Sequence, residues 1–167
     1  VLSAIASTAN KVYDSTTLAN TTLTLSGLIG SETLNVTANS TFDNKNIGSG
    51  KTVTVNSITL VDGTNGGLAA NYSIATSQTT TANVTAKALT AIASTANKVY
   101  DSTTLANTTL TLSGLIGSET LNVTANSTFD NKNIGSGKTV TVNSITLANG
   151  TNGGLASNYS IATSQIT

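Results

Sequence analysis

The chain has 167 residues and a formal net charge of zero, with seven Lys balanced by five Asp and two Glu. It has no basic stripe of the kind that binds nucleic acid, and no apolar run long enough to cross a bilayer as a helix. Cys, His, Met, Trp and Pro are absent, so we expect no disulfide framework, no nucleic-acid partner and no membrane insertion.

The segment Ala4–Leu60 recurs unchanged at Ala91–Leu147, an offset of 87 residues. When Val1–Thr80 is aligned with Ala88–Thr167, 74 of 80 positions are identical. An internal repeat of this kind predicts two copies of one structural unit, and we place them at residues 1–86 and 87–167. Because the sequence begins inside one repeat and stops short of another, we expect it to be part of a longer chain.

Alternation of apolar and polar residues, typical of half-buried strands, recurs along each repeat. The first two runs are Thr22–Ser26 and Leu34–Asn39, and the turn signal Gly27–Glu32 between them predicts a hairpin. Thr, Val, Ile, Ser, Asn and Gly dominate the composition, and all of them rank below the good helix formers. We therefore expect helix to be absent or confined to single turns.

The alternation changes phase in the next run. Val53 and Val55 share one parity, whereas Ile58 and Leu60 have the other. A one-residue slip would turn those side chains to the opposite face, so we predict a bulge or bend near Asn56-Ser57. The preceding stretch Gly48–Thr52 lacks the spacing of a phosphate-binding loop and is interpreted as a hairpin turn.

A glycine-rich turn, Asp62–Gly67, precedes a strand predicted to start at Tyr72. The segment Leu68–Ile74 fits a tyrosine corner, in which a Tyr hydroxyl bonds back to upstream backbone, and it fits equally a plain core Tyr. The join Thr81–Thr90 has neither Gly nor Pro. It therefore predicts a strand that runs directly into the next strand, and a semi-rigid connection between repeats.

Short strands separated by Gly and Asn turns predict an all-β chain of two tandem antiparallel β-sandwich domains of the immunoglobulin-like, Greek-key type. Each repeat has only three aromatic residues, and we expect each of them to anchor the core. The candidate structural positions are these aromatics and the Asp that follows the first Tyr of each repeat: Tyr13, Asp14, Phe42, Tyr72, Tyr100, Asp101, Phe129 and Tyr159.

The stretch Lys11-Val12-Tyr13-Asp14-Ser15-Thr16-Thr17 resembles the signature of YDG-type repeats in very large, filamentous-haemagglutinin-like bacterial adhesins. Phe42–Val53 and Asn71–Ile74 are similar to later motifs of that family. The resemblance implies an all-β stalk module of an exported adhesin, secreted or at the bacterial cell surface and in biofilms. Its implied partners are neighbouring repeats of the same chain and further copies along a fibre. The family usually has Gly where Ser15 and Ser102 stand, and a positive φ there would strain Ser.

Catalytic chemistry has little support in the residues. The usual hydrolytic triads and zinc sites need His or Cys, and turn or surface roles explain the few acids, so we expect no enzyme and no cofactor. A calcium site at Asp62–Gly67 would need its carboxylate, but the second copy has Asn149 in place of Asp62. We therefore expect no metal site and interpret the segment as a turn.

A stalk or spacer that projects a distal binding region is the function that a near-identical tandem repeat favours. Two alternatives remain open from the sequence. One is a glycan- or host-protein-binding module, which would need aromatic residues beyond those of the core. The other is a self-assembling S-layer or filament subunit, for which a neutral chain rich in Thr and Asn is also suitable.

Overall fold

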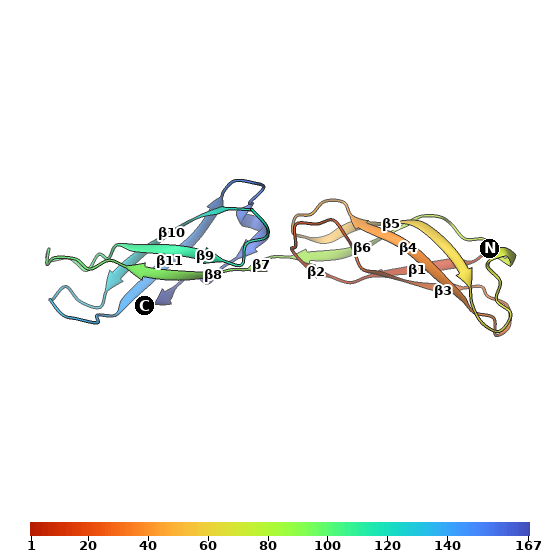
Figure 1. The fold of residues 1–167 in the computed structure, drawn as a ribbon, viewed down its shortest axis with the longest axis horizontal. Helices are drawn as coiled ribbons and strands as arrows, with labels where there is room; N and C mark the ends of the chain where they lie inside the picture. Colours follow the sequence, from red (N-terminus) through yellow and green to blue (C-terminus); the bar gives the residue numbers. More distant parts are fainter. The chain divides into compact units, whose positions relative to one another are not determined.

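Strands make up nearly all of the regular structure in the computed structural model, which describes all of residues 1–167. The helical elements are two 3-10 turns of three residues each, η1 (Ala69–Asn71) and η2 (Ala156–Asn158). The fold is thus all-β, and the prediction of single helical turns at most is confirmed. The chain divides into two units, Val1–Thr85 and Ala86–Thr167 (Figure 1). None of its helices is long and apolar enough to cross a membrane.

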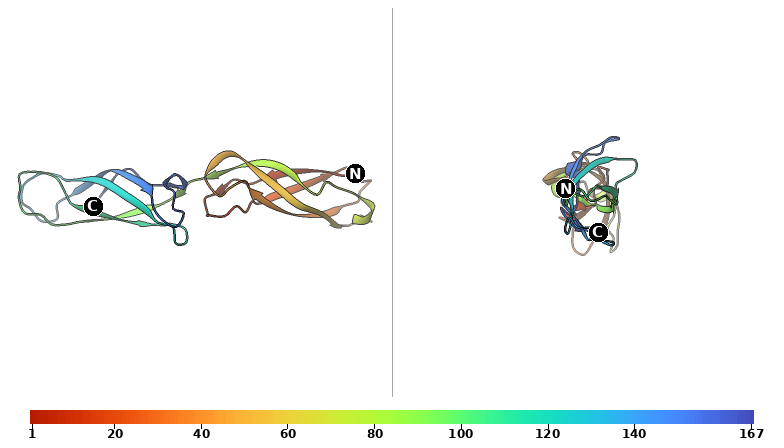
Figure 2. Two further views of the ribbon diagram at one scale, coloured as in Figure 1. Left: turned by 90° about the horizontal axis from the view of Figure 1, so that it is seen from above. Right: turned by 90° about the vertical axis from the view of Figure 1, so that its left-hand side faces the viewer.

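The first unit contains two sheets, whose strands run lengthwise and twist about one another (Figure 2). The smaller sheet is an antiparallel pair of β1 (Ser3–Thr8) and β3 (Thr21–Ser26). The larger sheet has the order β2-β6-β5-β4, built from β2 (Lys11–Val12), β6 (Gln78–Thr85), β5 (Gly48–Asp62) and β4 (Leu34–Phe42). Within it, β6 is antiparallel to β5 and parallel to β2.

A bulge in β5 keeps its apolar side chains on one face. The β4–β5 pairing runs from Thr37 opposite Thr59 to Asn39 opposite Asn56, so one extra residue is accommodated on β5. Ser57 takes the bulge conformation with a φ of 55°. Val55 and Ile58 are consequently both buried although their parity differs, which confirms the predicted bulge.

The predicted hairpin between the first two runs is wrong. β3 pairs with β1, and β4 pairs with β5, so the Gly27–Glu32 turn carries the chain from one sheet to the other. The turn is closed by the Glu32 amide, which donates to the Ile29 carbonyl at 3.2 Å. A turn signal shows where a chain reverses, but the choice of partner depends on strands that are distant in sequence.

The interpretation of Gly48–Thr52 as a hairpin turn is also wrong in the first unit. These residues begin β5, and the reversal occurs before them, at 43–47. Asn side chains favour the reversal by bonding nearby backbone: the Asn44 side-chain oxygen accepts the Asn46 amide at 3.0 Å. Gly48 and Gly50 therefore lie inside a paired strand and not in a turn.

The second unit repeats the small sheet with β8 (Thr90–Thr95) and β9 (Thr108–Ser113). Its larger sheet has the order β10-β11-β13, built from β10 (Leu121–Phe129), β11 (Val140–Asn149) and β13 (Gln165–Ile166). Val140, Val142 and Ile145 form its buried centre. A parallel pair of β7 (Lys87–Ala88) and β12 (Tyr159–Ser160) completes the unit.

The strand predicted at Tyr72 depends on a partner. In the first unit Tyr72 follows η1 directly and no strand starts before Gln78. In the second unit the equivalent Tyr159 begins β12, because Lys87 lies beside it in β7. The predicted run of strand into strand at the join is confirmed: β6 ends at Thr85, β7 follows at Lys87, and β8 begins at Thr90.

Candidate functional site

The segment Lys11–Asp14, which begins in β2, is held in place by the ammonium group of Lys11. Lys11 Nζ donates to Asp14 Oδ1 at 2.7 Å, to the Thr16 carbonyl at 2.9 Å and to the Leu18 carbonyl at 3.0 Å. The same Asp14 oxygen accepts the Thr16 amide at 2.9 Å, which closes a local turn. Lys11 and Asp14 thus hold the loop that follows β2 in one conformation.

That turn places the intervening Ser in the left-handed region. Ser15 has a φ of 62° and Ser102 has a φ of 63°. The positive φ that would strain Ser at the family's Gly position is therefore present in both copies. Since a side chain is unfavourable in this region, the chain stores strain at both Ser residues that Gly would relieve.

Two aromatic residues of the predicted set lie in the core beside this loop. Tyr13 is 1% exposed, and its amide donates to the Thr85 carbonyl at 2.8 Å. Phe42 is 3% exposed, and Lys11 Nζ lies 5.6 Å from the centre of its ring. The segment therefore links β2, β6 and the end of β4 at one end of the first unit.

A second Lys contributes at the same end, and the sequence interpretation missed it. Lys51 in β5 is buried, and its Nζ pairs with Asp43 Oδ1 at 2.7 Å and donates to the Asn44 side-chain oxygen at 2.9 Å. The second unit repeats the pair between Lys138 and Asp130 at 2.6 Å. In both copies a Lys follows an Asp by eight residues, and this spacing is visible in the sequence. Two side chains eight residues apart meet only if the chain turns back on itself between them, and the sequence interpretation had placed the turn elsewhere.

These ion pairs lower the pKa values of the Asp side chains. The Lys98 ammonium, together with the Thr103 amide, lowers the pKa of Asp101 to about 2. For Asp14, burial opposes ionisation, but the bonds from Lys11 and Thr16 outweigh it and lower the pKa. Lys51 and Lys138 likewise lower the pKa values of Asp43 and Asp130. All four carboxylates are therefore stabilised in the charged form.

Tyr72 holds the turn that precedes β4 in the first unit. Its hydroxyl donates to Glu32 Oε2 at 2.5 Å and accepts the Ile29 amide at 3.2 Å. The hydroxyl thus bonds the turn before β4, and not the backbone a few residues upstream as in a tyrosine corner. Tyr159 makes the same two contacts in the second unit, with Glu119 at 2.6 Å and Ile116 at 3.2 Å.

The Asp62–Gly67 segment behaves as a turn in both copies. The Asp62 side-chain oxygen accepts the Ala69 amide at 2.7 Å, and the Asn149 side-chain oxygen accepts the Ala156 amide at 2.8 Å. The carboxylate oxygen of Asp62 and the amide oxygen of Asn149 both accept a backbone N–H, so either residue can close this turn. Gly67 is needed because a Cβ there would lie 1.9 Å from the Thr33 carbonyl oxygen.

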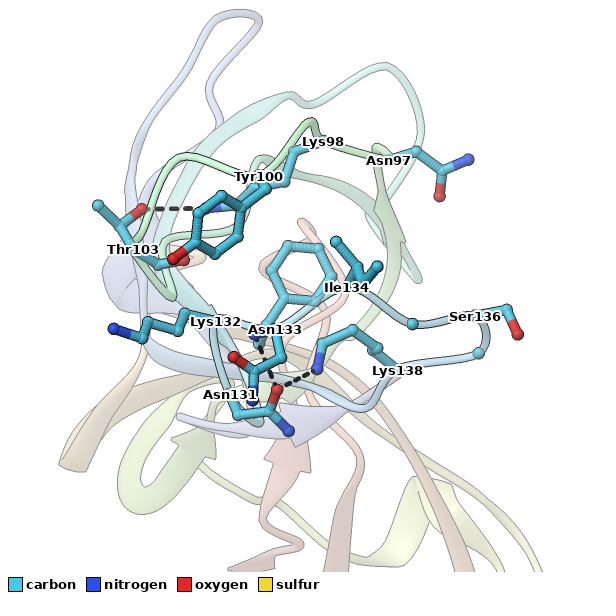
Figure 3. A pocket seen from close by; sticks show the side chains of 13 residues that line it. Asn97, Lys98, Tyr100, Thr103, Asn131, Lys132, Asn133, Ile134, Ser136 and Lys138 are labelled. Atoms are coloured by element: carbon cyan, nitrogen blue, oxygen red, sulfur yellow. Dashed lines mark hydrogen bonds between the residues drawn. The ribbon is translucent and has the colours of Figure 1, made fainter.

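The aromatic residues of the second unit are placed differently, which corrects the expectation that all six anchor a core. Tyr159 is buried and Phe129 is partly buried, but Tyr100 is 55% exposed. In the first unit β6 bonds the backbone beside Tyr13, and the second unit has no strand in that place. Tyr100 lines an open hollow of about 360 Å³ together with Phe129, Ile134 and Lys138 (Figure 3). Asp101 remains paired with Lys98 at 2.8 Å.

No group of three or more His, Cys, Asp or Glu side chains comes together in the structure. The comparison with protein families matches the YDG domain twice, at residues 1–82 and 85–166. Neither a curated protein nor a solved structure matches the chain. The two matches cover nearly the whole sequence, and the chain therefore belongs to the YDG domain family, with two copies in tandem.

Proposed function

We propose that the chain is a structural spacer: two immunoglobulin-like sandwich modules from the stalk of an exported, filamentous-haemagglutinin-like bacterial adhesin. Its partners in this proposal are neighbouring copies of the same module. Support comes from the tandem YDG match and from the near-identity of the copies, since copy number adds length to a spacer but adds little to an enzyme. The observation that carries the proposal is how the chain passes through one unit.

The chain enters and leaves the first unit in the same direction. β2 near its start is parallel to β6 at its end, with Lys11 opposite Val84 and Val12 opposite Thr85. Because both strands point the same way, the chain comes in at one end of the unit and goes out at the other (Figure 1). A module with this path lengthens a chain by its own long dimension each time it is repeated.

The same pairing suits a module that is pulled at its ends. Tension on the chain draws β2 and β6 in opposite directions along their common axis. The β2–β6 bonds and the Tyr13–Thr85 bond are then loaded together in shear, and they must break together. We call this set of bonds between β2 and β6 the clamp. Forced unfolding depends on the unfolding rate, and the clamp slows it because several bonds must break at once.

Single-molecule force spectroscopy on the 167-residue protein tests the mechanical part of the proposal. We expect two unfolding events, with the higher force for the first unit, because the second unit has no counterpart of the β2–β6 pair. Val84→Asp, which puts a charge at a position 2% exposed, should lower the higher force. Val99→Asp, at a position 88% exposed, is the matched control and should change neither force. Equal forces for the two units would contradict the clamp.

A display experiment tests the spacer role itself. The chain is placed in one, two or three copies between an outer-membrane anchor and an epitope tag on bacterial cells. We expect binding of a large antibody to the tag to rise with copy number, because each copy moves the tag further from the surface. Antibody binding that does not depend on copy number would contradict the proposal.

A further inference from the structure

The small sheet of each unit has only two strands, so each of its strands has one edge without a neighbour in the sheet. In the first unit β3 pairs with β1 along its whole length, Thr21–Ser26. In the second unit β9 pairs with β8 in the same register, and its sequence, Thr108–Ser113, is identical to that of β3. Both copies show the same arrangement, so this edge is a property of the repeat.

The other strands at sheet margins are protected. Beside β1, the Leu2 amide donates to the Ser73 carbonyl at 2.7 Å, and beside β4, the Ala19 amide donates to the Ser40 carbonyl at 3.0 Å. The second unit repeats both bonds, at 2.7 and 2.9 Å. β2 carries a charged residue, Lys11, at the margin of the large sheet. Covering segments and edge Lys residues are two devices that keep a strand from pairing with another chain.

β3 has none of these protections. The backbone groups of Thr21–Ser26 bond only with β1. The strand has no charged residue, no Pro and no bulge, and Figure 1 shows it along the margin of the first unit. An uncharged, regular strand with a free edge is a template for pairing with another strand.

The alternation of the β1–β3 ladder determines which backbone groups of β3 are free. The Ala9 amide donates to the Asn20 carbonyl at 3.0 Å, and this bond continues the ladder beyond the two strands. In an antiparallel pair every second residue bonds its partner. The N–H and C=O groups of Leu23 and Leu25 therefore point away from β1, whereas those of Thr24 point toward it.

The free edge of β3 is complementary to a second copy of itself. Antiparallel pairing about a two-fold axis at Leu23 sets Thr21 opposite Leu25 of the other copy, and Thr22 opposite Thr24. Opposite residues of an antiparallel pair point to the same face, so half-buried positions meet half-buried ones and exposed positions meet exposed ones. Neither the strand nor the chain carries a net charge, so the two copies do not repel each other.

We propose that the free edges of β3 and β9, the pairing edges, bind the same edges of a second copy of this chain. Two small sheets then join into one antiparallel sheet of four strands. Because every chain carries two pairing edges of identical sequence, two weak contacts can act together. This inference does not depend on the proposed spacer role, whose partners are neighbouring modules of one chain.

Sedimentation equilibrium on the 167-residue protein measures the association. We expect the average mass to rise toward that of a dimer between about 10 µM and about 1 mM protein. A Lys form of the protein carries Lys at Thr22, Thr24, Thr109 and Thr111, which sets like charges opposite each other across the axis. It should associate more weakly by about ten-fold or more.

The matched control carries the same added charge elsewhere. Its Lys residues replace exposed Thr residues of the large sheet and its loops, Thr52, Thr59, Thr139 and Thr146. This control form should associate as the parent protein does. Weaker association of both forms would assign the effect to net charge and would overturn the proposed edge.

A Glu form, with Glu at the four positions of the Lys form, supplies a complementary edge. Neither form alone should associate as the parent does, but an equimolar mixture should, because Lys then lies opposite Glu. One molar salt should weaken the mixed pair. A mixture of the Glu form with the control form should stay monomeric, since its opposite charges do not meet across the pairing edges.

Amide hydrogen exchange of the parent protein tests the edge without any variant. Association should slow exchange at Leu23 and Leu25 by about ten-fold and leave Thr24, already bonded to β1, nearly unchanged. The corresponding amides of β9, Leu110 and Leu112, should behave like those of β3. This pattern remains a test even if the Lys form does not fold.

Concentration-dependent association with protection of alternate amides supports the proposal. A parent protein that stays monomeric to about 1 mM overturns it and leaves the edge to a strand of a different polypeptide. Association without protection of Leu23 and Leu25 also overturns it, because the contact then lies elsewhere. Protection that does not depend on protein concentration would mean that the edges pair within one chain, and would overturn the proposed occupant.

Discussion

The backbone amide of Tyr13 donates to the carbonyl of Thr85 across a distance of 2.8 Å, joining a residue early in the sequence of the first unit to its last residue. Tyr100 has the same neighbours in sequence as Tyr13 but no strand beside it, and it is 55% exposed. Burial of the Tyr in the family's Tyr-Asp motif therefore depends on the strand that pairs beside it. Val84, the residue before Thr85, has a buried side chain.

Val84→Ala should destabilise the first unit by about 2 kcal/mol and leave the second unit unchanged, because Val84 is 2% exposed and belongs to the first unit. Hydrogen exchange in increasing denaturant measures the two units separately. The matched control is Val99→Ala, whose side chain is 88% exposed and should cost well under 0.5 kcal/mol. A loss of stability shared by both units would show that they unfold together.

Ser15→Gly and Ser102→Gly should each stabilise their own unit, by roughly 0.5–1 kcal/mol. Both Ser residues have a positive φ, so Gly removes backbone strain that exceeds its extra entropy in the unfolded chain. Chemical denaturation of the single and double variants checks this. Ser7→Gly in β1 is the control and should destabilise, since Gly weakens a strand. Lower stability for Ser15→Gly would mean that the Asp14 turn tolerates Ser without strain.

Tyr159→Phe should cost the second unit roughly 1–3 kcal/mol, because the change removes a hydroxyl that bonds Glu119, a carboxylate only 7% exposed. Tyr72→Phe removes the same bond in the first unit and should cost less, since Glu32 is half-buried. Thermal unfolding of the two variants side by side gives the comparison. Equal losses would mean that burial of the carboxylate does not set the cost of losing the bond.

Stability should fall as the solution is acidified from pH 5 toward pH 2. The folded-state pKa of Asp101 is about 2 and its ordinary value is 3.8, so the folded chain binds fewer protons than the unfolded chain in this range. The contribution is complete above the unfolded pKa and is lost as pH falls through the folded one. Asp14, Asp43 and Asp130 act in the same direction. Melting temperature against pH is the measurement.

Two controls define the origin of that pH dependence. Asp101→Asn should make the curve of the second unit less steep, because one of its two Asp side chains with a lowered pKa is gone and only Asp130 remains. One molar salt should reduce the slope for the parent protein, since these Asp side chains are solvent-accessible and their pairs are screened. A slope that neither change affects would assign the acid sensitivity to other groups.

A chelator should leave the melting temperature unchanged, as the loss of a carboxylate from one copy predicts. Asp62 and Asn149 each use a side-chain oxygen to accept a backbone amide seven residues later, and this role needs no cation. Thermal unfolding with and without excess chelator is the measurement, and Asp62→Asn is the matched variant. A clear fall in melting temperature that Asp62→Asn abolishes would reveal a metal site in the first turn.

Local features of this protein could be predicted from the sequence because they depend on near neighbours. The strand positions of β3 and β4 and the bulge at Ser57 follow from alternation and parity within a few residues. The strain at Ser15 was suggested by the family resemblance, because the family usually has Gly at that position. The YDG motif likewise identified the family from contiguous residues. Each of these features occurs in both copies because the residues that determine it lie inside the repeated segment.

Pairing between distant segments was decided only by the tertiary structure. Alternation marks a strand but not its partner, so the predicted hairpin of β3 with β4 was wrong and the burial of Lys51 was not foreseen. The clearest case is Lys11–Val12 against Lys98–Val99, one sequence with two conformations. A short edge segment is held as a strand only when backbone groups from elsewhere in the chain satisfy its own. For β2 those groups belong to Val84 and Thr85, more than 70 residues away.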